Sequence, residues 1–246
     1  MNNMKAFLGR GALAGLAGGA VAAVFQWTVT ETQIRKALEL EAANETGAHE
    51  EMFSRSTQVL GGMVGGVLFG LFAGLIFGFV SALLWRRASH EGGAFRRSIG
   101  LAGAVFVVWT LVPGLKYPAN PPGVGNPDTI DQRTASYLIL LVVSVLVAIL
   151  AREVWGQMTA RGFAGAPRFA VVAGAYLAVI AALYVVFPAN PDSIDAPASL
   201  IWHFRLDSLA GNALLWLVLG TVFGWLGDRA ATRIDSKPSH HESVPT

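Results

Sequence analysis

The sequence predicts an all-α integral membrane protein with about six transmembrane helices, arranged as three repeated helical hairpins with both termini in the cytoplasm. Composition is the first reason: 53% of the 246 residues are apolar and only 14% are charged, whereas soluble domains carry roughly 25% charged residues. The second reason is that long apolar stretches recur, and a bilayer core about 30 Å thick requires about 20 helical residues. A disordered chain or an ordinary soluble enzyme does not fit this composition.

The apolar stretches set the number of spans. We place them near Gly11–Val29, Val59–Trp85, Ser98–Val112, Ala135–Ala151, Phe169–Phe187 and Ser208–Gly227. The second is long enough to tilt, whereas the third and fourth are short and need their flanking residues. Lys5 and Arg10 before the first stretch also fit the start of a secretory signal peptide, but its glycine content favours a retained span.

The six stretches are expected to form one polytopic membrane domain over residues 1–230, with hairpins near 5–87, 97–152 and 168–229, followed by a flexible cytoplasmic tail over 231–246. The loop after the first span is unusual because Glu31, Arg35 and Glu39 are spaced for ion pairs along a helix. We therefore expect both helices of the first hairpin to continue beyond the bilayer and to turn near Asn44–Gly47.

The distribution of charged residues among the loops predicts on which side of the membrane the termini lie. The loops on the side of the two termini contain twelve Lys and Arg residues and five Asp and Glu residues, whereas the other three loops contain six and eleven. Basic loops stay in the cytoplasm, so both termini are expected there. An acidic outer face would raise the local concentration of cations, although ordinary topology bias produces the same asymmetry.

Several chemistries are excluded by the residues present. The chain has no cysteine, which removes disulfides, thiolate metal sites and iron–sulfur clusters. It has neither a G-x-x-x-x-G-K-[ST] phosphate loop nor an H-E-x-x-H motif. We expect no enzymatic activity, no bound prosthetic group and, with a net charge of only +2, no nucleic-acid partner. Membrane lipid is the expected surrounding, and any transport energy must come from a partner or the membrane potential.

The outer loops of the second and third hairpins resemble each other. Tyr117-Pro-Ala-Asn-Pro121 is echoed by Phe187-Pro-Ala-Asn-Pro191, and Asp128-Thr-Ile-Asp131 by Asp192-Ser-Ile-Asp195. An arginine precedes the returning span of each hairpin, at Arg55, Arg133 and Arg205. This pattern predicts an internal repeat, and repeats in transporters often place the substrate site between the copies. Duplication of a stable hairpin explains the pattern equally well.

Glycines recur at every fourth position of the second span, at Gly62, Gly66, Gly70, Gly74 and Gly78. The first span has Gly11, Gly15 and Gly19 at the same spacing. Small residues on one helical face allow helices to approach closely in lipid. We interpret the two spans as a tightly crossed pair or, alternatively, as a seam between the protomers of a homo-oligomer.

The segment Pro113-Gly-Leu-Lys-Tyr-Pro-Ala-Asn-Pro-Pro-Gly-Val-Gly-Asn-Pro-Asp-Thr-Ile-Asp-Gln-Arg133 is distinctive. It resembles the signature of the CbtA family of predicted cobalt transporter subunits, as do Phe187-Pro-Ala-Asn-Pro191 and Trp202-His-Phe-Arg205. The resemblance covers the chain from the first span to about Gly227. That family is usually described with five spans, one fewer than the six counted here.

The resemblance implies a multi-pass protein of a prokaryotic inner (plasma) membrane that takes part in cobalt(II) uptake for cobalamin biosynthesis. It also implies a small partner subunit that carries histidines (CbtB). The resemblance supplies no established metal ligands, so candidates must come from the residues themselves.

Carboxylates of the outer loops are the first candidates for metal ligands. Asn126-Pro-Asp128 and Asn190-Pro-Asp192 each fit a helix N-cap followed by proline and an acid, which is a structural role. Asp131 and Asp195 lie three residues further on, so each pair could offer several oxygens to a divalent cation. His203 and Asp207 are four residues apart on one helical face, and imidazole and carboxylate suit cobalt(II).

Other polar residues are weaker candidates. His49, Glu50 and Glu51 fit a capture point or a solvated turn, and His240 and His241 fit a solvated tail. The candidates for a transport pathway are Glu31, Asn120, Asn190 and Asn212. Asn212 is expected within the bilayer, where its amide can hydrogen-bond across helices.

Three alternatives to cobalt uptake follow from the sequence. The glycine stripes also fit a non-conducting scaffold that helps other subunits assemble. Another divalent metal such as nickel fits the same ligand types, because nitrogen and oxygen ligands do not select cobalt by affinity alone. A membrane enzyme is disfavoured, because Ser81 and Ser144 have no histidine in a span to pair with.

Overall fold

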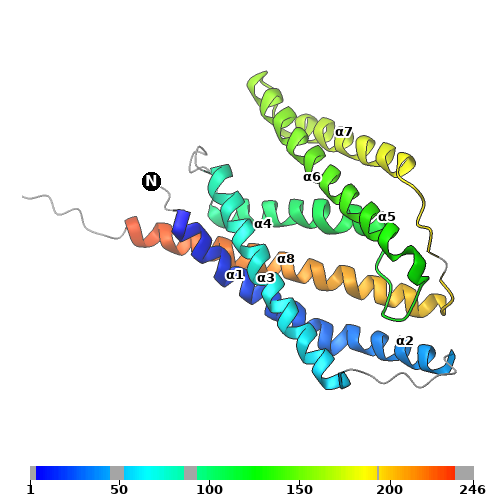
Figure 1. Cartoon of the computed structure of the whole chain (residues 1–246). Helices are drawn as coiled ribbons and strands as arrows, with labels where there is room; N and C mark the ends of the chain where they lie inside the picture. Colours follow the sequence, from blue (N-terminus) through cyan, green and yellow to red (C-terminus); the bar gives the residue numbers. More distant parts are fainter. Residues whose placement is uncertain (1–3, 45–52, 86–92, 193, 236–246) are drawn as a thin grey trace, which may run out of the picture. The chain divides into compact units, whose positions relative to one another are not determined.

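The computed structural model describes residues 4–44, 53–85, 93–192 and 194–235, and every regular element in these ranges is a helix (Figure 1). The elements are α1 (Met4–Phe25), η1 (Gln26–Thr30), α2 (Glu31–Asn44), α3 (Arg55–Trp85), α4 (Ala94–Val105), η2 (Phe106–Leu111), α5 (Val112–Lys116), η3 (Pro127–Thr129), α6 (Ile130–Ala160), α7 (Gly165–Val186) and α8 (Ala198–Asp235).

Six helical stretches of the described chain are long and apolar enough to cross a membrane. They are Met4–Ala43, Arg55–Trp85, Ala94–Lys116, Pro127–Ala160, Gly165–Val186 and Ala198–Thr232. The predicted class of all-α protein with six spans is confirmed, and the short third span is part of a 23-residue helix. The hairpin repeat and the cytoplasmic position of the termini stay predictions.

Helices extend beyond the predicted spans, and two of these extensions bear on the predicted loops and tail. Helix continues from α1 through η1 and α2 to Asn44, so the predicted extension of the first span is confirmed. The expected turn at Gly47 lies outside the described residues, as do His49, Glu50 and Glu51. Helix α8 continues to Asp235, into the predicted tail, and residues 236–246 with His240 and His241 also lie outside the described part.

The chain packs as two compact units, each assembled from separate segments. Unit 1 contains Met1–Val24, Ser54–Gly103 and Leu214–Thr246, and unit 2 contains Phe25–Phe53 and Ala104–Ala213. Helices α4 and α8 therefore each contribute one part to unit 1 and the other part to unit 2.

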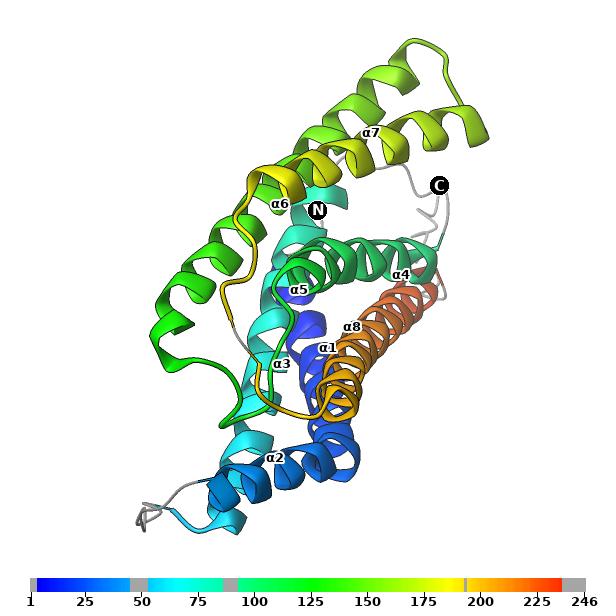
Figure 2. The same cartoon turned by 90° about the vertical axis from the view of Figure 1, so that its right-hand side faces the viewer.

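Backbone contact between α1 and α3 organises unit 1 (Figure 2). A Cβ atom added at Gly70 would lie 2.5 Å from the Gly15 carbonyl oxygen, and one added at Gly78 would lie 2.5 Å from the Phe7 carbonyl oxygen. One added at Gly74 would lie 2.7 Å from the Gly15 Cα. Such distances leave room only for glycine, which confirms that these two spans form a tightly crossed pair.

The glycines at every fourth position of α3, from Gly62 to Gly78, do not all pack against α1. Gly66 faces Ala23 at ordinary contact distance, and Gly62 is exposed. The neighbouring Gly61 and Gly65 meet nothing within 4 Å. The close helix pair is therefore made by the glycines from Gly66 to Gly78, and the start of α3 presents an open surface.

The remaining helices of unit 1 join this pair through small residues and aromatic rings. Gly18 of α1 faces Leu215 of α8, and Gly220 of α8 faces Ala102 of α4. The Asp228 carboxylate accepts hydrogen bonds from the first backbone N–H groups of α4, with 2.7 Å between its Oδ1 and the Ala94 nitrogen. This bond supplies one of the acceptors that a helix N-terminus lacks. Rings of the core are Phe7, Phe77, Trp85 and Phe223.

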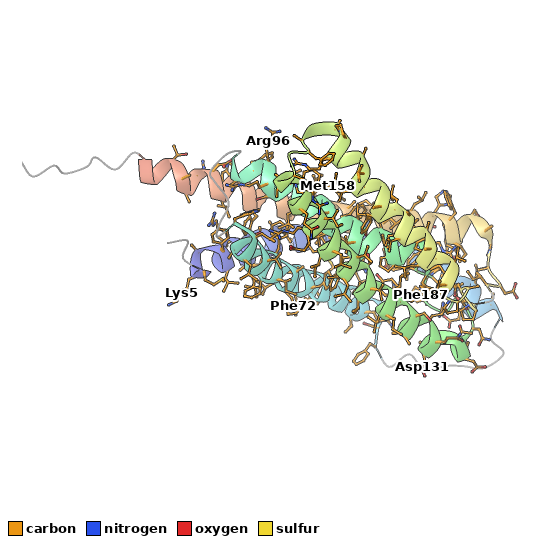
Figure 3. The ribbon with its side chains drawn as sticks, turned by 90° about the horizontal axis from the view of Figure 1, so that it is seen from above. Lys5, Phe72, Arg96, Asp131, Met158 and Phe187 are labelled. Atoms are coloured by element: carbon orange, nitrogen blue, oxygen red, sulfur yellow. The ribbon has the colours of Figure 1, made fainter. Side chains whose placement is uncertain are left out.

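Unit 2 contains the α6–α7 hairpin and the π-helical segment η2. Figure 3 shows Met158 at one end of this hairpin and Asp131 and Phe187 at the other. A π-helix shifts the backbone hydrogen bonds by one residue, and Ser144 of α6 donates a hydrogen bond of 3.1 Å to the Val108 carbonyl oxygen within η2. The buried Ser144 thereby joins α6 to this altered turn, which is a structural role.

Apolar side chains remain exposed along the spans, as a lipid-facing surface requires. Helix α7 buries only Ile180, whereas Leu177, Val185 and Val186 are exposed. In water, such large exposed apolar surfaces would mark an interaction site or drive aggregation. Their position on helices long enough to span a bilayer assigns them to contact with hydrocarbon.

Gly74→Ala tests the α1–α3 contact. The new methyl group would lie against the backbone of Gly11 and Gly15, so we expect the helices to separate and the free energy of unfolding to fall by about 1–3 kcal/mol. Thermal unfolding in detergent, followed by tryptophan fluorescence, measures the loss. Gly65→Ala in the same helix is the control because its methyl group meets nothing within 4 Å. Equal stability of the two variants would contradict this packing.

Candidate functional site

The two related loops begin at the same point relative to their helices. Helix α5 ends at Lys116, directly before Tyr117-Pro-Ala-Asn, and α7 ends at Val186, directly before Phe187-Pro-Ala-Asn. In both cases the aromatic residue forms a bend and the next three residues are irregular. Proline explains the endings, because it disfavours helical conformation in the residue before it.

Polar bonds hold these two loops against each other within unit 2. The Tyr117 hydroxyl donates to the Pro188 carbonyl oxygen at 2.8 Å, and the Lys116 Nζ donates to the Tyr184 carbonyl oxygen at 2.8 Å. The Tyr184 hydroxyl donates in return to the Val112 carbonyl oxygen. Carbonyl groups at the end of α7, in the loop after it and in α5 thus accept hydrogen bonds from side chains of the opposite segment.

Asp192 is the centre of the polar network. Its side chain is fully buried and forms an ion pair with Arg133 of α6. The same carboxylate accepts from the Asn120 side-chain amide and, at 2.8 Å, from the Asn126 backbone N–H. Gly125 approaches so closely, with φ of +109°, that an added Cβ would lie 2.7 Å from Asp192 Oδ2. The carboxylate is therefore occupied by protein donors, which gives it a structural role.

Arg205 of α8 joins the network by donating hydrogen bonds to the loop that follows α5. Its Nη2 donates to Asn120 Oδ1 at 2.9 Å, and its Nε donates to the Ala119 carbonyl oxygen at 3.3 Å. Both acceptors are uncharged. The two guanidinium groups and the one carboxylate of this network therefore have a net charge of +1.

Only the first of the two Asn-Pro-Asp motifs starts a helix. The Asn126 side chain accepts a hydrogen bond of 2.9 Å from the Asp128 backbone N–H and caps η3, which leads into α6, so the predicted helix start is confirmed there. The Asn190 side chain accepts the equivalent bond from Asp192 at 3.3 Å, yet α8 begins only at Ala198. The predicted helix start at Asn190 is therefore wrong, because Asp192 is held by the neighbouring loop.

The other predicted carboxylates of these loops are exposed. Asp128, Asp131 and Asp195 all lie on the surface of unit 2. Across the described ranges, the structure brings no three His, Asp or Glu side chains together as a ready metal cage. The proposed ligation by Asp128, Asp131, Asp192 and Asp195 is thus not preassembled.

His203 and Asp207 occupy one face of α8, as the spacing predicts, but they have different surroundings. His203 is exposed, and its Nδ1 lies 2.6 Å from the Ser199 carbonyl oxygen one turn earlier. Asp207 is partly buried, and its Oδ2 is enclosed without a hydrogen-bond partner. A carboxylate oxygen without a partner remains able to accept a hydrogen bond or to contact a cation.

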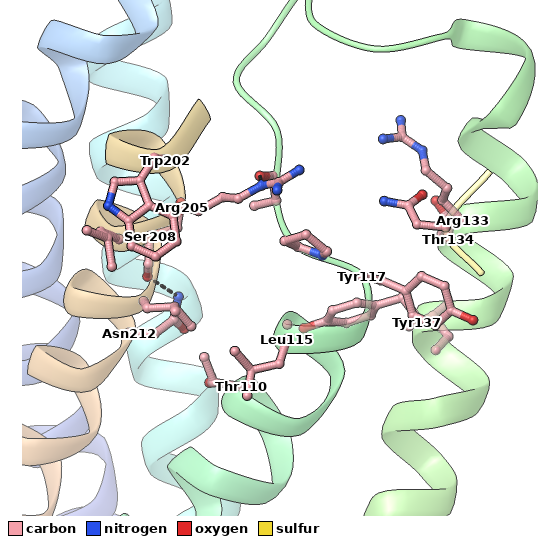
Figure 4. Close-up of a pocket in the computed structure, with 17 residues that line it drawn as sticks. Thr110, Leu115, Tyr117, Arg133, Thr134, Tyr137, Trp202, Arg205, Ser208 and Asn212 are labelled. Carbon is pink, nitrogen blue, oxygen red and sulfur yellow. Dashed lines mark hydrogen bonds between the residues drawn. The ribbon is translucent and has the colours of Figure 1, made fainter. Parts of the chain in front are cut away.

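A cavity of about 650 Å³ lies beside the network within unit 2 (Figure 4). Residues of η2, α5, α6 and α8 and of both Pro-Ala-Asn loops line it. Its polar residues are Thr110, Arg133, Thr134, Asn190, Arg205, Ser208 and Asn212, and its larger apolar and aromatic ones are Leu115, Tyr117, Tyr137, Leu138, Trp202, Leu206 and Leu209.

The predicted pathway residues divide into two groups. Asn190 and Asn212 line the cavity, whereas Asn120 is bonded between Asp192 and Arg205, and Glu31 begins α2. The Asn212 amide donates to the Ser208 carbonyl oxygen of its own helix at 2.9 Å, rather than across helices as predicted. Sequence reasoning missed Thr110 and Tyr137, and it noted Trp202 only as part of the family motif, whereas the signals that pointed to the cavity were Asn190, Asn212 and the recurring arginine.

These features define a multi-pass helical membrane protein with an ordered polar network and a basic cavity among its apolar helices. The sequence model of the family described as "Probable cobalt transporter subunit (CbtA)" matches residues 4–228. The chain belongs to this family, which implies a transporter subunit with cobalt as its substrate and at least one partner. No curated protein and no solved structure matches the chain.

Asp192→Ala tests whether the carboxylate is structural. Removing it leaves the Arg133 guanidinium and the Asn120 amide without their acceptor, and breaking a buried ion pair costs about 3 kcal/mol. Chemical denaturation in detergent measures the free energy of unfolding. The control Asp195→Ala removes an exposed carboxylate of the same loop and is expected to change it by less than about 0.5 kcal/mol. Similar values for both would refute the structural assignment.

Proposed function

We propose that this chain is the membrane subunit of a cobalt(II) uptake system in a prokaryotic inner membrane, where it supports cobalamin biosynthesis. The observation that carries the proposal is the family match over residues 4–228. The six candidate spans support it, since a chain crossing the bilayer several times can enclose a path between helical hairpins.

The exposed carboxylates have a specific part in this proposal. Asp128, Asp131 and Asp195 belong to the loops and the start of α6 that hold the buried Asp192 network, and the charge asymmetry predicts that these loops lie outside the cell. Exposed acids attract divalent cations without holding them tightly. Weak binding suits uptake, because transport requires release as well as binding. His203 and Asp207 on α8 are the proposed next ligands.

The proposed transport needs a source of energy and a partner subunit. The chain has no phosphate loop, so we assign the driving force to the membrane potential or to a partner. A potential of 100 mV is worth about 2.3 kcal/mol per charge, or roughly 4.6 kcal/mol for a divalent cation entering a negative interior. The proposed partner is a small histidine-bearing subunit of the CbtB type, which would supply imidazole ligands.

Cobalt accumulation in cells tests the proposed role of the exposed ligands. We expect Asp128→Ala, Asp131→Ala and His203→Ala each to lower cobalt content by roughly twofold or more, because fewer cations gather at the entrance. Metal content is measured by mass spectrometry at matched protein levels. Glu153→Ala is the control, since Glu153 is an exposed acid of α6 on the predicted cytoplasmic side. Uptake equal to that of the unmodified protein in all three variants would remove them from the pathway.

Reconstitution separates uptake from a scaffold role. If the chain conducts, liposomes that contain only the purified protein should take up cobalt(II) when the interior is made negative, and uptake should rise with the potential. Uptake by liposomes that contain only the partner, with none by liposomes that contain only this chain, would assign the chain a scaffold role. Faster uptake of nickel than of cobalt would change the assigned metal.

A further inference from the structure

The charge of the cavity does not match a bare metal cation. Of the residues that line it, Arg133 and Arg205 are the charged ones, and both are cationic. The carboxylate nearest to them along the network, Asp192, is already bonded to Arg133. Arg205 has only the uncharged oxygens of Asn120 and Ala119 as acceptors in the described chain. A divalent cation entering the cavity would be repelled.

Two guanidinium groups that line one cavity favour an anionic ligand there, because opposite charges attract. The Arg133 Nε is buried and has no hydrogen-bond partner, although the Nη1 of the same group is bonded to Asp192. Free N–H groups of guanidinium are arranged to bind carboxylate or phosphate oxygens.

Thr110 provides a second, independent observation. Its side chain lines the cavity, the residue is only 7% exposed, and its Oγ1 has no hydrogen-bond partner. A helical threonine usually bonds the carbonyl oxygen one turn earlier, but Thr110 belongs to the π-helical segment η2, where the backbone register is shifted. A buried hydroxyl without a partner costs free energy, which a ligand in the cavity would recover.

The polar groups lie at separate positions along the cavity. Arg205 and Asn212 are seven residues apart in α8, about 10 Å along the helix axis. Figure 4 shows Arg205 extending from α8 toward the loop that follows α5, with Thr110 at the same end as Asn212. Between these positions the wall contains apolar and aromatic side chains such as Leu209, Tyr117 and Tyr137.

We propose that this cavity binds an amphiphilic oxyanion. The carboxylate or phosphate group of the ligand accepts hydrogen bonds from Arg133 and Arg205, its apolar part lies along the leucine and tyrosine side chains, and a second polar group bonds Thr110. An anionic phospholipid and a free dicarboxylic acid share this chemistry. The proposal goes beyond cobalt uptake, because binding of the anion requires no metal.

Binding to the purified, delipidated full-length protein tests the proposal by calorimetry without added metal. One arm uses phosphatidylglycerol in neutral mixed micelles, with phosphatidylcholine as its neutral control. The other arm uses suberate, an eight-carbon dicarboxylate, with 1,8-octanediol as its neutral control. We expect saturable binding of one anion per chain in at least one arm and none of the neutral controls. Binding of only the lipid assigns a headgroup, and binding of only suberate assigns a soluble acid.

Variants locate the binding in the cavity. Arg205→Gln should weaken it by roughly tenfold or more, as loss of a charge-assisted bond implies, and Thr110→Val by roughly threefold. Arg161→Gln removes an exposed charge beyond the end of α6 and should change nothing. Arg205→Lys keeps the charge without the planar fork and should retain partial affinity even if Arg205→Gln fails to fold. No anion binding in either arm, or affinity unchanged in Arg205→Lys and Thr110→Val, would overturn the proposal.

Discussion

Hydrocarbon forms no hydrogen bonds, and this constraint determines the structure of the whole chain. Each backbone N–H and C=O group within the bilayer must find its partner inside the protein, which selects helices over every open alternative. Helices can then associate only through close packing and a few polar bonds, since burial of apolar surface gains little in lipid. Both devices are present: glycine contacts between α1 and α3, and side-chain bonds to carbonyl groups around η2 and α5.

The polar network of unit 2 follows from the same constraint. Proline ends α5 and α7, so the last carbonyl groups of these helices need other donors. Lys116 donates to the Tyr184 carbonyl oxygen in the last turn of α7, Tyr117 and Arg205 donate to loop carbonyl oxygens, and the Asp192 carboxylate accepts from the Asn126 backbone N–H. A carboxylate used in this way contributes to loop order rather than to metal binding.

The exposed loops and the cavity of unit 2 differ in the charge of their side chains. The side chains of Asp128, Asp131 and Asp195 are exposed, whereas the residues that line the cavity include arginine, hydroxyl and amide groups but no carboxylate. A cation is attracted to the first surface and an anion to the second. In a family of probable cobalt transporter subunits, this difference in charge is the basis on which we propose cation gathering at the exposed loops and anion binding in the cavity.

Length, hydropathy and residue spacing were enough to predict the helical membrane class, the six spans and the α1–α3 glycine contact, because these properties act locally along the chain. The recurrence of arginine before the returning spans also marked Arg133 and Arg205. The burial of Asp192 by Arg133, Asn120 and Asn126, and the position of Thr110 at a cavity, emerged only from the folded chain. These are contacts between residues up to 72 positions apart, and local pattern carries no information about which distant donor reaches a given carboxylate.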